Sequence, residues 1–322
     1  MSGVRNFKKI LSLALVLLLL LCAAACNGAR EEGDGLKIVV TVFPEYDWVM
    51  QILGDRADGA EVTLLLNNGT DIHSYQPSVS DLVKISECDI FIYVGGNTES
   101  WVEDALKNVS NSEMKVICLT EVLSDRVVED GHEGEADHEH DHESVIDEHI
   151  WLSLRNAQRC CEYIADQIAA IDPENADEYK KNAADYCDLL SALDGEYQSA
   201  VEDAEFNTLI FADRFPFRYL VDDYSIEYFA AFSGCSTETD ASFETVAFLV
   251  DKLDESGVGS LIVIDGSDGK LANTVKANAA SESVVIRTLD SMQSVTASDI
   301  KNGTTYLSVM KENLETLKKA LN

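Results

Sequence analysis

The sequence predicts an α/β protein of two lobes, each with a parallel sheet flanked by helices, joined by a long rigid backbone helix. Two observations lead to this fold class. Short, continuous apolar runs alternate with helical patterns in both halves of the chain, which is typical of parallel strands buried on both faces. Between the halves, apolar residues recur at steps of three and four over roughly 30 residues, or about 45 Å of helix, long enough to serve both lobes.

The first lobe is expected at 36–153, with four strands and three helices in alternation. The strands are expected at 37–43, 61–66, 90–94 and 115–119, and the helices at 44–53, 78–87 and 99–108. Ligands of such sheets bind beyond the carboxyl ends of the strands. His73 follows the second of these strands, so it is expected at that edge.

The connecting helices are expected at 154–205 and the second lobe at 206–322. Asp172 and Pro173 form an N-cap and a first helical position, and the long one-sided helix follows them. The second lobe repeats the first in type, with strands expected at 208–212, 226–232, 260–264 and 284–287 and helices at 243–255, 271–279 and 304–321.

The first 25 residues are expected to be an export signal, because a basic start precedes an apolar run too short for a membrane span. Small residues lead directly to Cys26, as in a lipobox, so Cys26 is the predicted lipid anchor and 26–35 a flexible linker. Cleavage after Ala25 with a free cysteine, or before Cys22, is the alternative. The protein is therefore expected outside the cytoplasm, anchored as a lipoprotein.

The net charge of −34 limits the partners of the protein. Nucleic acid is excluded as a partner and an anionic membrane surface would repel the body, whereas cations are attracted. The eight cysteines include no CxxC pair, and their spacing predicts no particular disulfide.

Five of the six histidines lie between 132 and 151, where they are interleaved with Asp and Glu. Histidine is the commonest metal ligand, and such a run predicts a loop at 131–143 that collects metal without fixed geometry. Its histidines are His132, His138, His140 and His142. A solvated acidic loop with incidental histidines is the alternative. His149 differs from these four, because an apolar segment begins directly after it.

Two histidines and two carboxylates are expected where the two lobes face each other. His73, His149, Asp213 and Asp290 each follow an expected strand or stand at an abrupt loop end. Such a set suits Zn²⁺ or Mn²⁺. Taken separately, Asp213 also fits a helix N-cap and Asp290 a turn.

From about residue 37 to the end, the chain resembles the metal-specific solute-binding lipoproteins of ATP-binding-cassette importers, which bind zinc or manganese. Residues 69–77 (GTDIHSYQP) resemble the loop of the first ligand, and 147–152 (DEHIWL) resembles the second-ligand motif Asp-Pro-His-x-Trp-Leu, with Glu148 in place of Pro. Residues 288–310 resemble the segment in which an Asp closes the site. An acidic, histidine-rich loop before the second ligand is typical of the zinc-specific branch.

The chain departs from the family at the third ligand, commonly His or Glu. Here the segment reads FADRFPFRY, and alignment on Tyr219 places Arg214 at the ligand position. Arginine has no lone pair to give to a metal. We therefore expect Asp213 as the ligand, with Arg214 pairing nearby carboxylates and Asp147 as a further neighbour of the site. A site of three protein ligands completed by water is the alternative.

The resemblance implies a monomeric extracytoplasmic binding protein, not an enzyme, that captures Zn(II) between its lobes and delivers it to an ATP-binding-cassette permease in the membrane. A manganese binder or a metal-dependent cell-adhesion protein on the same fold is the alternative. A zinc hydrolase is the remaining one, but the chain lacks HExxH and Gly-x-Ser-x-Gly.

Overall fold

The computed structural model describes residues 35–128, 146–234, 236 and 241–322. The expected export signal, the anchor Cys26 and the linker lie outside the described residues. So do His132, His138, His140 and His142 of the expected collecting loop.

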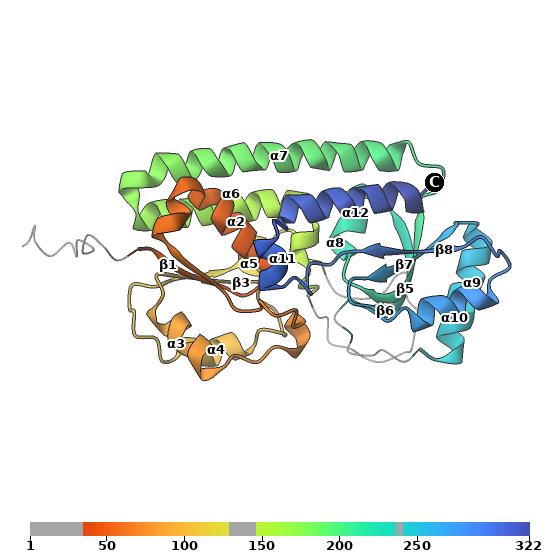
Figure 1. The fold of residues 1–322 in the computed structure, drawn as a ribbon, viewed down its shortest axis with the longest axis horizontal. Coiled ribbons are helices and arrows are strands. Elements are labelled where there is room, and N and C mark those ends of the chain that lie inside the picture. The colour runs from red at the N-terminus through yellow and green to blue at the C-terminus, as the bar shows by residue number, and fades with distance from the viewer. Residues whose placement is uncertain (1–34, 129–145, 235, 237–240) are drawn as a thin grey trace, which may run out of the picture. The chain divides into compact units, whose positions relative to one another are not determined.

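The first lobe is built on a four-stranded parallel sheet of order β2-β1-β3-β4. Its strands are β1 (Lys37–Val40), β2 (Glu61–Leu64), β3 (Ile90–Tyr93) and β4 (Lys115–Cys118). Its helical segments are α2 (Phe43–Leu53), η1 (Gly54–Gly59), η2 (Ile72–Ser74), α3 (Val79–Glu87), α4 (Trp101–Leu106) and α5 (Leu119–Val122). Helices α3 and α4 lie on the side of this sheet away from the long helix α7 (Figure 1).

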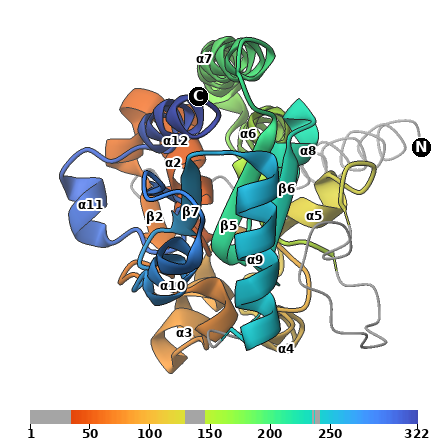
Figure 2. The same ribbon diagram turned by 90° about the vertical axis from the view of Figure 1, so that its right-hand side faces the viewer.

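The second lobe repeats this topology, with a four-stranded parallel sheet of order β6-β5-β7-β8. Its strands are β5 (Thr208–Phe215), β6 (Glu227–Ser233), β7 (Ser260–Ile264) and β8 (Val285–Leu289). Its helices are α8 (Arg218–Tyr224), α9 (Phe243–Ser256), α10 (Lys270–Asn278), α11 (Ala297–Lys301) and α12 (Tyr306–Ala320). Helices α9 and α10 pack against each other beside this sheet (Figure 2).

Two long helices join the lobes, as predicted. Helix α6 (Leu154–Ile171) follows η3 (Ile150–Leu152), and η4 (Pro173–Asn175) leads into α7 (Ala176–Glu202), which has 27 residues. Helix α7 runs alongside α6, α2 and α12 (Figure 1). Its buried side chains recur at steps of three and four, as the sequence pattern predicts: Tyr179, Ala183, Tyr186, Leu190, Leu193 and Tyr197.

One hydrophobic core runs through both lobes, because the first sheet, the connecting helices and one face of the second sheet share a single cluster of buried side chains. The other face of the second sheet packs separately against α9 and α10. Side chains alternate between the two clusters along β5, with Leu209 and Phe211 in the shared core and Ile210 and Ala212 in the outer one. The joint between the lobes is therefore packed rather than hinged on an isolated linker.

The predicted strands are present, and one boundary matters for function. Strand β5 continues to Phe215, three residues beyond its predicted end, so Asp213 and Arg214 lie within the strand and not after it. The pairing of β5 with β6 shifts register between Phe211 and Arg214, and the ring of Phe215 stacks on Tyr228 at 4.0 Å. This cross-strand stacking extends the strand. Among the described residues, no helix combines the length and apolar character needed to cross a membrane.

Candidate metal centre

His149 is fully buried and held in one orientation. The side chain of Asp147 accepts hydrogen bonds from the backbone N–H of His149 at 2.8 Å and from its ring Nδ1 at 2.9 Å. The ring of Trp151 lies edge-on to the His149 ring, with centroids 5.3 Å apart. A carboxylate can only accept, so the proton lies on Nδ1 and Nε2 carries the lone pair, the nitrogen with which a histidine can bind a metal.

His73 belongs to a short helical turn in the loop after β2. Asp71 caps this turn by accepting the backbone N–H of His73 at 2.9 Å. The hydroxyl of Thr98, in the loop after β3, lies 3.1 Å from Nδ1 of His73. Burial, together with nearby His149, lowers the pKa of His73 to about 4, so the ring is neutral at physiological pH and able to bind a metal.

The two histidines face each other through their Nε2 atoms. Nε2 of His73 and Nε2 of His149 are 3.3 Å apart. Two nitrogens bound to one Zn²⁺ at about 2.0–2.1 Å with a tetrahedral angle are about 3.3–3.4 Å apart, whereas a right-angled octahedral pair at the same bond length is about 2.9 Å apart. The spacing of the two rings therefore fits two corners of a tetrahedral zinc site.

Arg214 reaches from the second lobe to the loop of His73. Its Nη2 forms an ion pair with Oδ2 of Asp71 at 2.8 Å, while Oδ1 of the same carboxylate caps the His73 turn. Burial alone would raise the pKa of Asp71, but the His73 N–H and the Arg214 charge outweigh it and lower that pKa. The Arg214 charge also disfavours protonation of His73, which places the guanidinium in the electrostatic surroundings of the site.

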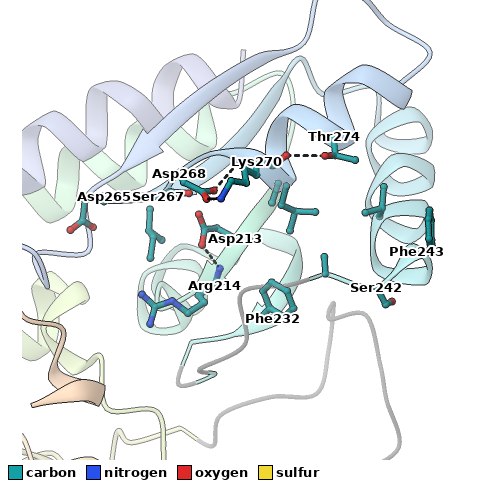
Figure 3. A pocket seen from close by; sticks show the side chains of 16 residues that line it. Asp213, Arg214, Phe232, Ser242, Phe243, Asp265, Ser267, Asp268, Lys270 and Thr274 are labelled. Carbon is teal, nitrogen blue, oxygen red and sulfur yellow. Dashed lines mark hydrogen bonds and ion pairs between the residues drawn. The ribbon is translucent and has the colours of Figure 1, made fainter.

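Asp213 and Arg214 point in different directions. Figure 3 shows the guanidinium of Arg214 directed away from the Asp213 carboxylate. Oδ1 of Asp213 accepts the backbone N–H of Arg214 at 2.9 Å. Both residues line a cavity of about 640 Å³ at the carboxyl ends of β5 and β7. The side chain of β5 that reaches the His73 loop is thus the positively charged Arg214 and not Asp213.

Asp290 follows β8 directly, as predicted, and starts a loop fixed at both ends. Its Oδ1 accepts the backbone N–H of Met292 at 2.7 Å, and its own N–H donates to Asn313 at 2.8 Å. Burial and the negative charge of Asp265 raise the pKa of Asp290 to about 6. A bound cation would relieve both effects.

Asp265 clamps the Asp290 loop. One carboxylate oxygen accepts the backbone N–H and the hydroxyl of Ser291, each at 2.6 Å, and the other accepts the N–H and hydroxyl of Ser294. The carbonyl of Ser291 in turn accepts Nε1 of Trp151 at 2.9 Å. The loop of Asp290 is therefore tied to the residue that packs against His149.

A chain of hydrogen bonds connects the supports of both histidines. The backbone N–H of Thr98 donates to Oε1 of Glu148 at 2.8 Å, so the residue beside His149 holds the loop that orients His73. Gly96 permits this approach, since a Cβ there would lie 2.4 Å from the Glu148 carboxylate, and its φ of 91° suits glycine. Glu148 thus has a packing role at the position where the family motif has Pro.

Two more buried carboxyls lie beneath this chain. Glu45 accepts the backbone N–H groups of Thr41 and Val42, and Glu99 accepts that of Gly95. Burial raises the pKa of Glu45 to about 7, and burial together with Glu45 raises that of Glu99 to about 8. One oxygen of each has no hydrogen-bond partner in the part of the chain that the structure describes.

The structure thus brings together two of the four predicted ligands. Within the described residues, no group of three or more His, Cys, Asp or Glu side chains is close enough to hold a metal ion. Asp213 and Asp290 as ligands stay predictions. Sequence reasoning missed Thr98 and Asp265. It predicted that Arg214 pairs with a nearby carboxylate, and the structure confirms this with Asp71 as the partner. Asp265 follows β7 and so could have been found by the rule that singled out Asp290.

The flanks of segment 129–145 meet at one point. The N–H of Asp147 donates to the carbonyl of Val128 at 2.9 Å, and the Tyr219 hydroxyl donates to the Asp147 carbonyl at 2.7 Å. The same hydroxyl accepts the N–H of Val128 at 3.3 Å. Val128, the last described residue before this segment, is therefore bonded to Asp147, two residues before His149.

Comparison with known proteins decides the family. The model of the family described as "Zinc-uptake complex component A periplasmic" matches residues 38–320. The chain belongs to this family. It is a family of zinc-uptake components and not of enzymes, as the sequence predicts.

Two relatives are named as zinc-binding or zinc-uptake proteins. The zinc-binding lipoprotein AdcA of Streptococcus pneumoniae serotype 4 is 32% identical over 313 residues, which are 96% of this chain and 60% of AdcA. The high-affinity zinc uptake system protein ZnuA of Bacillus subtilis is 28% identical over 98% of both chains. The chain thus spans about three fifths of the first relative and nearly all of the second.

A solved relative confirms the fold. The crystal structure of the Zn(II)-bound ZnuA-like domain of Streptococcus pneumoniae AdcA superposes with a TM-score of 0.71 at 30% identity, covering 89% of this chain and 99% of that domain. That domain holds Zn(II), the ion that the sequence predicts for this chain.

Proposed function

We propose that this protein captures Zn²⁺ between its two lobes and hands it to an ATP-binding-cassette permease. The observation that carries the proposal is the 3.3 Å spacing of the two Nε2 atoms, with each ring held through its other nitrogen. This pair is prepared for a tetrahedral ion before the ion arrives, and histidine nitrogen is a favoured donor for zinc.

Asp290 supplies the third ligand in this proposal. Its carboxylate follows β8, and its loop is tied to Trp151 beside His149. For the fourth position, the direction of the Arg214 side chain favours the alternative of a non-protein ligand over Asp213. The Asp213 ligand remains testable by substitution.

The proposal also includes the lipid-anchored linker at 26–35, the histidine-rich loop at 131–143 and the permease. Cys26 would carry the lipid anchor, and the histidines of 131–143 would bind Zn²⁺ more weakly than the site between the lobes. The monomer would then dock on the permease with its ion enclosed, in keeping with the membership of an uptake-complex family.

The direct test is competition between Zn²⁺ and Mn²⁺ in calorimetry of the exported chain, with X-ray absorption at the zinc edge of the loaded protein. We expect one tight zinc site with two histidine nitrogens among four ligands, lost in His73→Ala. Preference for Mn²⁺, or a six-coordinate zinc spectrum, would contradict the proposal. An adhesin would instead be indicated if deleting the permease failed to reproduce the growth defect of deleting this protein in low zinc.

A further inference from the structure

Arg214 brings more hydrogen-bond capacity to the site than its ion pair uses. A guanidinium has five N–H donors in a planar fork, and the contact with Asp71 engages Nη2. In the described structure the other side-chain donors of Arg214 have no second partner. The side chain is 21% exposed and borders the cavity of about 640 Å³.

The same residue places a positive charge beside the site, where its ion-pair partner Asp71 acts on His73 more strongly and in the opposite sense. Arg214 itself cannot ligate a metal and cannot lose its proton. A ligand bearing negative charge can bond both to a metal held by His73 and His149 and to the guanidinium. Arginine is well suited to that role, because its fork matches the two oxygens of a carboxylate.

The coordination count leaves one position for such a ligand. This inference rests on the proposed function, in which His73, His149 and Asp290 fill three corners of a tetrahedron around the metal. Figure 3 shows the guanidinium of Arg214 directed away from the carboxylate of Asp213, the fourth candidate. The fourth corner is then left to a ligand that Arg214, which reaches the His73 loop, can hold.

We propose that the metal is captured together with one small planar oxyanion, carbonate or a simple carboxylate, which fills the fourth metal position and is held by Arg214. The second oxygen of the anion accepts N–H groups of the guanidinium that Asp71 does not use. The carboxylates of Asp213, Asp265 and Asp268 also line the cavity and repel an anion, and its other cation, Lys270, is paired with Asp268.

The test is the anion dependence of zinc affinity. The exported chain is titrated with Zn²⁺ against a competing chelator, in decarbonated perchlorate buffer under argon, without addition or with bicarbonate, acetate or phosphate. A His73→Ala, His149→Ala double variant reports binding elsewhere on the chain and is subtracted. Bicarbonate and acetate are expected to tighten the site by about tenfold or more, the size of a charge-assisted hydrogen-bond pair, with phosphate weaker.

Arg214→Met should abolish the response to bicarbonate, while Arg218→Met keeps it. Arg218 is a fair control because it has similar exposure, 24%, and a comparable ion pair with Asp222 on the same lobe. A second measurement on the unaltered protein needs no variant: one equivalent of ¹⁴C-carbonate should be retained with each zinc through gel filtration.

Zinc affinity that ignores all three anions would overturn the proposal, as would an equal response in Arg214→Met or a response to phosphate alone. In those cases zinc binding itself, and hence the transport role, would stand. Absence of tight zinc binding under every condition would instead contradict the proposed function.

Discussion

The two lobes share one strand order but differ at the edge that meets the other lobe. The first lobe presents two histidines whose second nitrogens are each held, His149 in a fully buried position and His73 in a partly buried one. The second lobe presents Arg214, Asp213 and Asp290 around a cavity and a clamped loop. The difference indicates that the first lobe carries the preformed half of the site and the second lobe tunes it.

The largest effect is expected from removing a histidine of the first lobe. His149→Ala should weaken Zn²⁺ binding by about a hundredfold to a thousandfold, roughly one ligand's share of a structural zinc site. Competitive titration measures the change. His138→Ala, in the segment proposed to collect metal, is the matched control and should leave the tight site intact. A tight site that survives His149→Ala would refute the division between the lobes.

A smaller loss is expected when the support of that histidine is changed. Asp147→Asn keeps the size of the side chain but no longer fixes the Nδ1 proton, so zinc affinity should fall by about 10–100-fold. Asp125→Asn, which alters an exposed ion pair with Arg159, is the control and should have no effect. If both variants bind zinc equally well, the orientation of His149 does not depend on Asp147.

In the second lobe, Asp265→Asn should act mainly on the loop of Asp290. The amide cannot accept all four hydrogen bonds, so the free energy of unfolding should fall by about 1–3 kcal/mol. Zinc affinity should fall by less than in Asp147→Asn. Denaturant unfolding and titration measure the two quantities. A loss of affinity as large as that of His149→Ala would show that the second lobe holds the metal more firmly than we infer.

The smallest effect on zinc is expected at the buried carboxyls of the first lobe, where stability should depend on pH instead. The pKa values of Glu45 and Glu99 are raised from 4.5 to about 7 and about 8, so the folded state binds more protons than the unfolded chain across this interval. Their contribution is complete below pH 4.5 and is lost as the pH rises toward 8. Each shifted group contributes a slope of at most about 1.4 kcal/mol per pH unit.

Glu99→Gln should flatten the upper part of that slope, between pH 7 and 8, in urea unfolding of the metal-free protein. Glu103→Gln, on an exposed turn of α4, is the control and should leave the slope unchanged. An identical pH profile for Glu99→Gln and the unaltered protein would mean that Glu99 is ionised in the fold.

Much of the fold could be predicted because its cues are local. Strand β7 has the predicted bounds, Ser260–Ile264, and α7 buries the predicted stripe. Helix α8 was missed because its seven residues directly follow a Pro-containing turn and are too short for a periodic pattern. The extension of β5 depends on Phe215 stacking against Tyr228 of another strand, which no local pattern reveals.

The site was predictable to the extent that strand ends place residues. That rule found His73 and Asp290, and the change from an acidic to an apolar segment found His149. It could not show that Arg214 would pair with Asp71, since the partners meet only when the lobes pack. Nor could it orient Asp213 relative to Arg214, because the shift in β5 register decides which side chain faces the first lobe.

The central claim is that the tight site lies between the lobes and not in the histidine-rich segment. Calorimetric titration of Zn²⁺ and Mn²⁺ into the mature protein lacking residues 131–143, beside the same protein carrying Asp213→Ala, tests it most directly. We predict that one tight site preferring Zn²⁺ survives the deletion, and that Asp213→Ala changes it little. If all tight binding disappeared with the segment, the histidine run itself would be the metal site and the pairing of His73 with His149 would not be the site of capture.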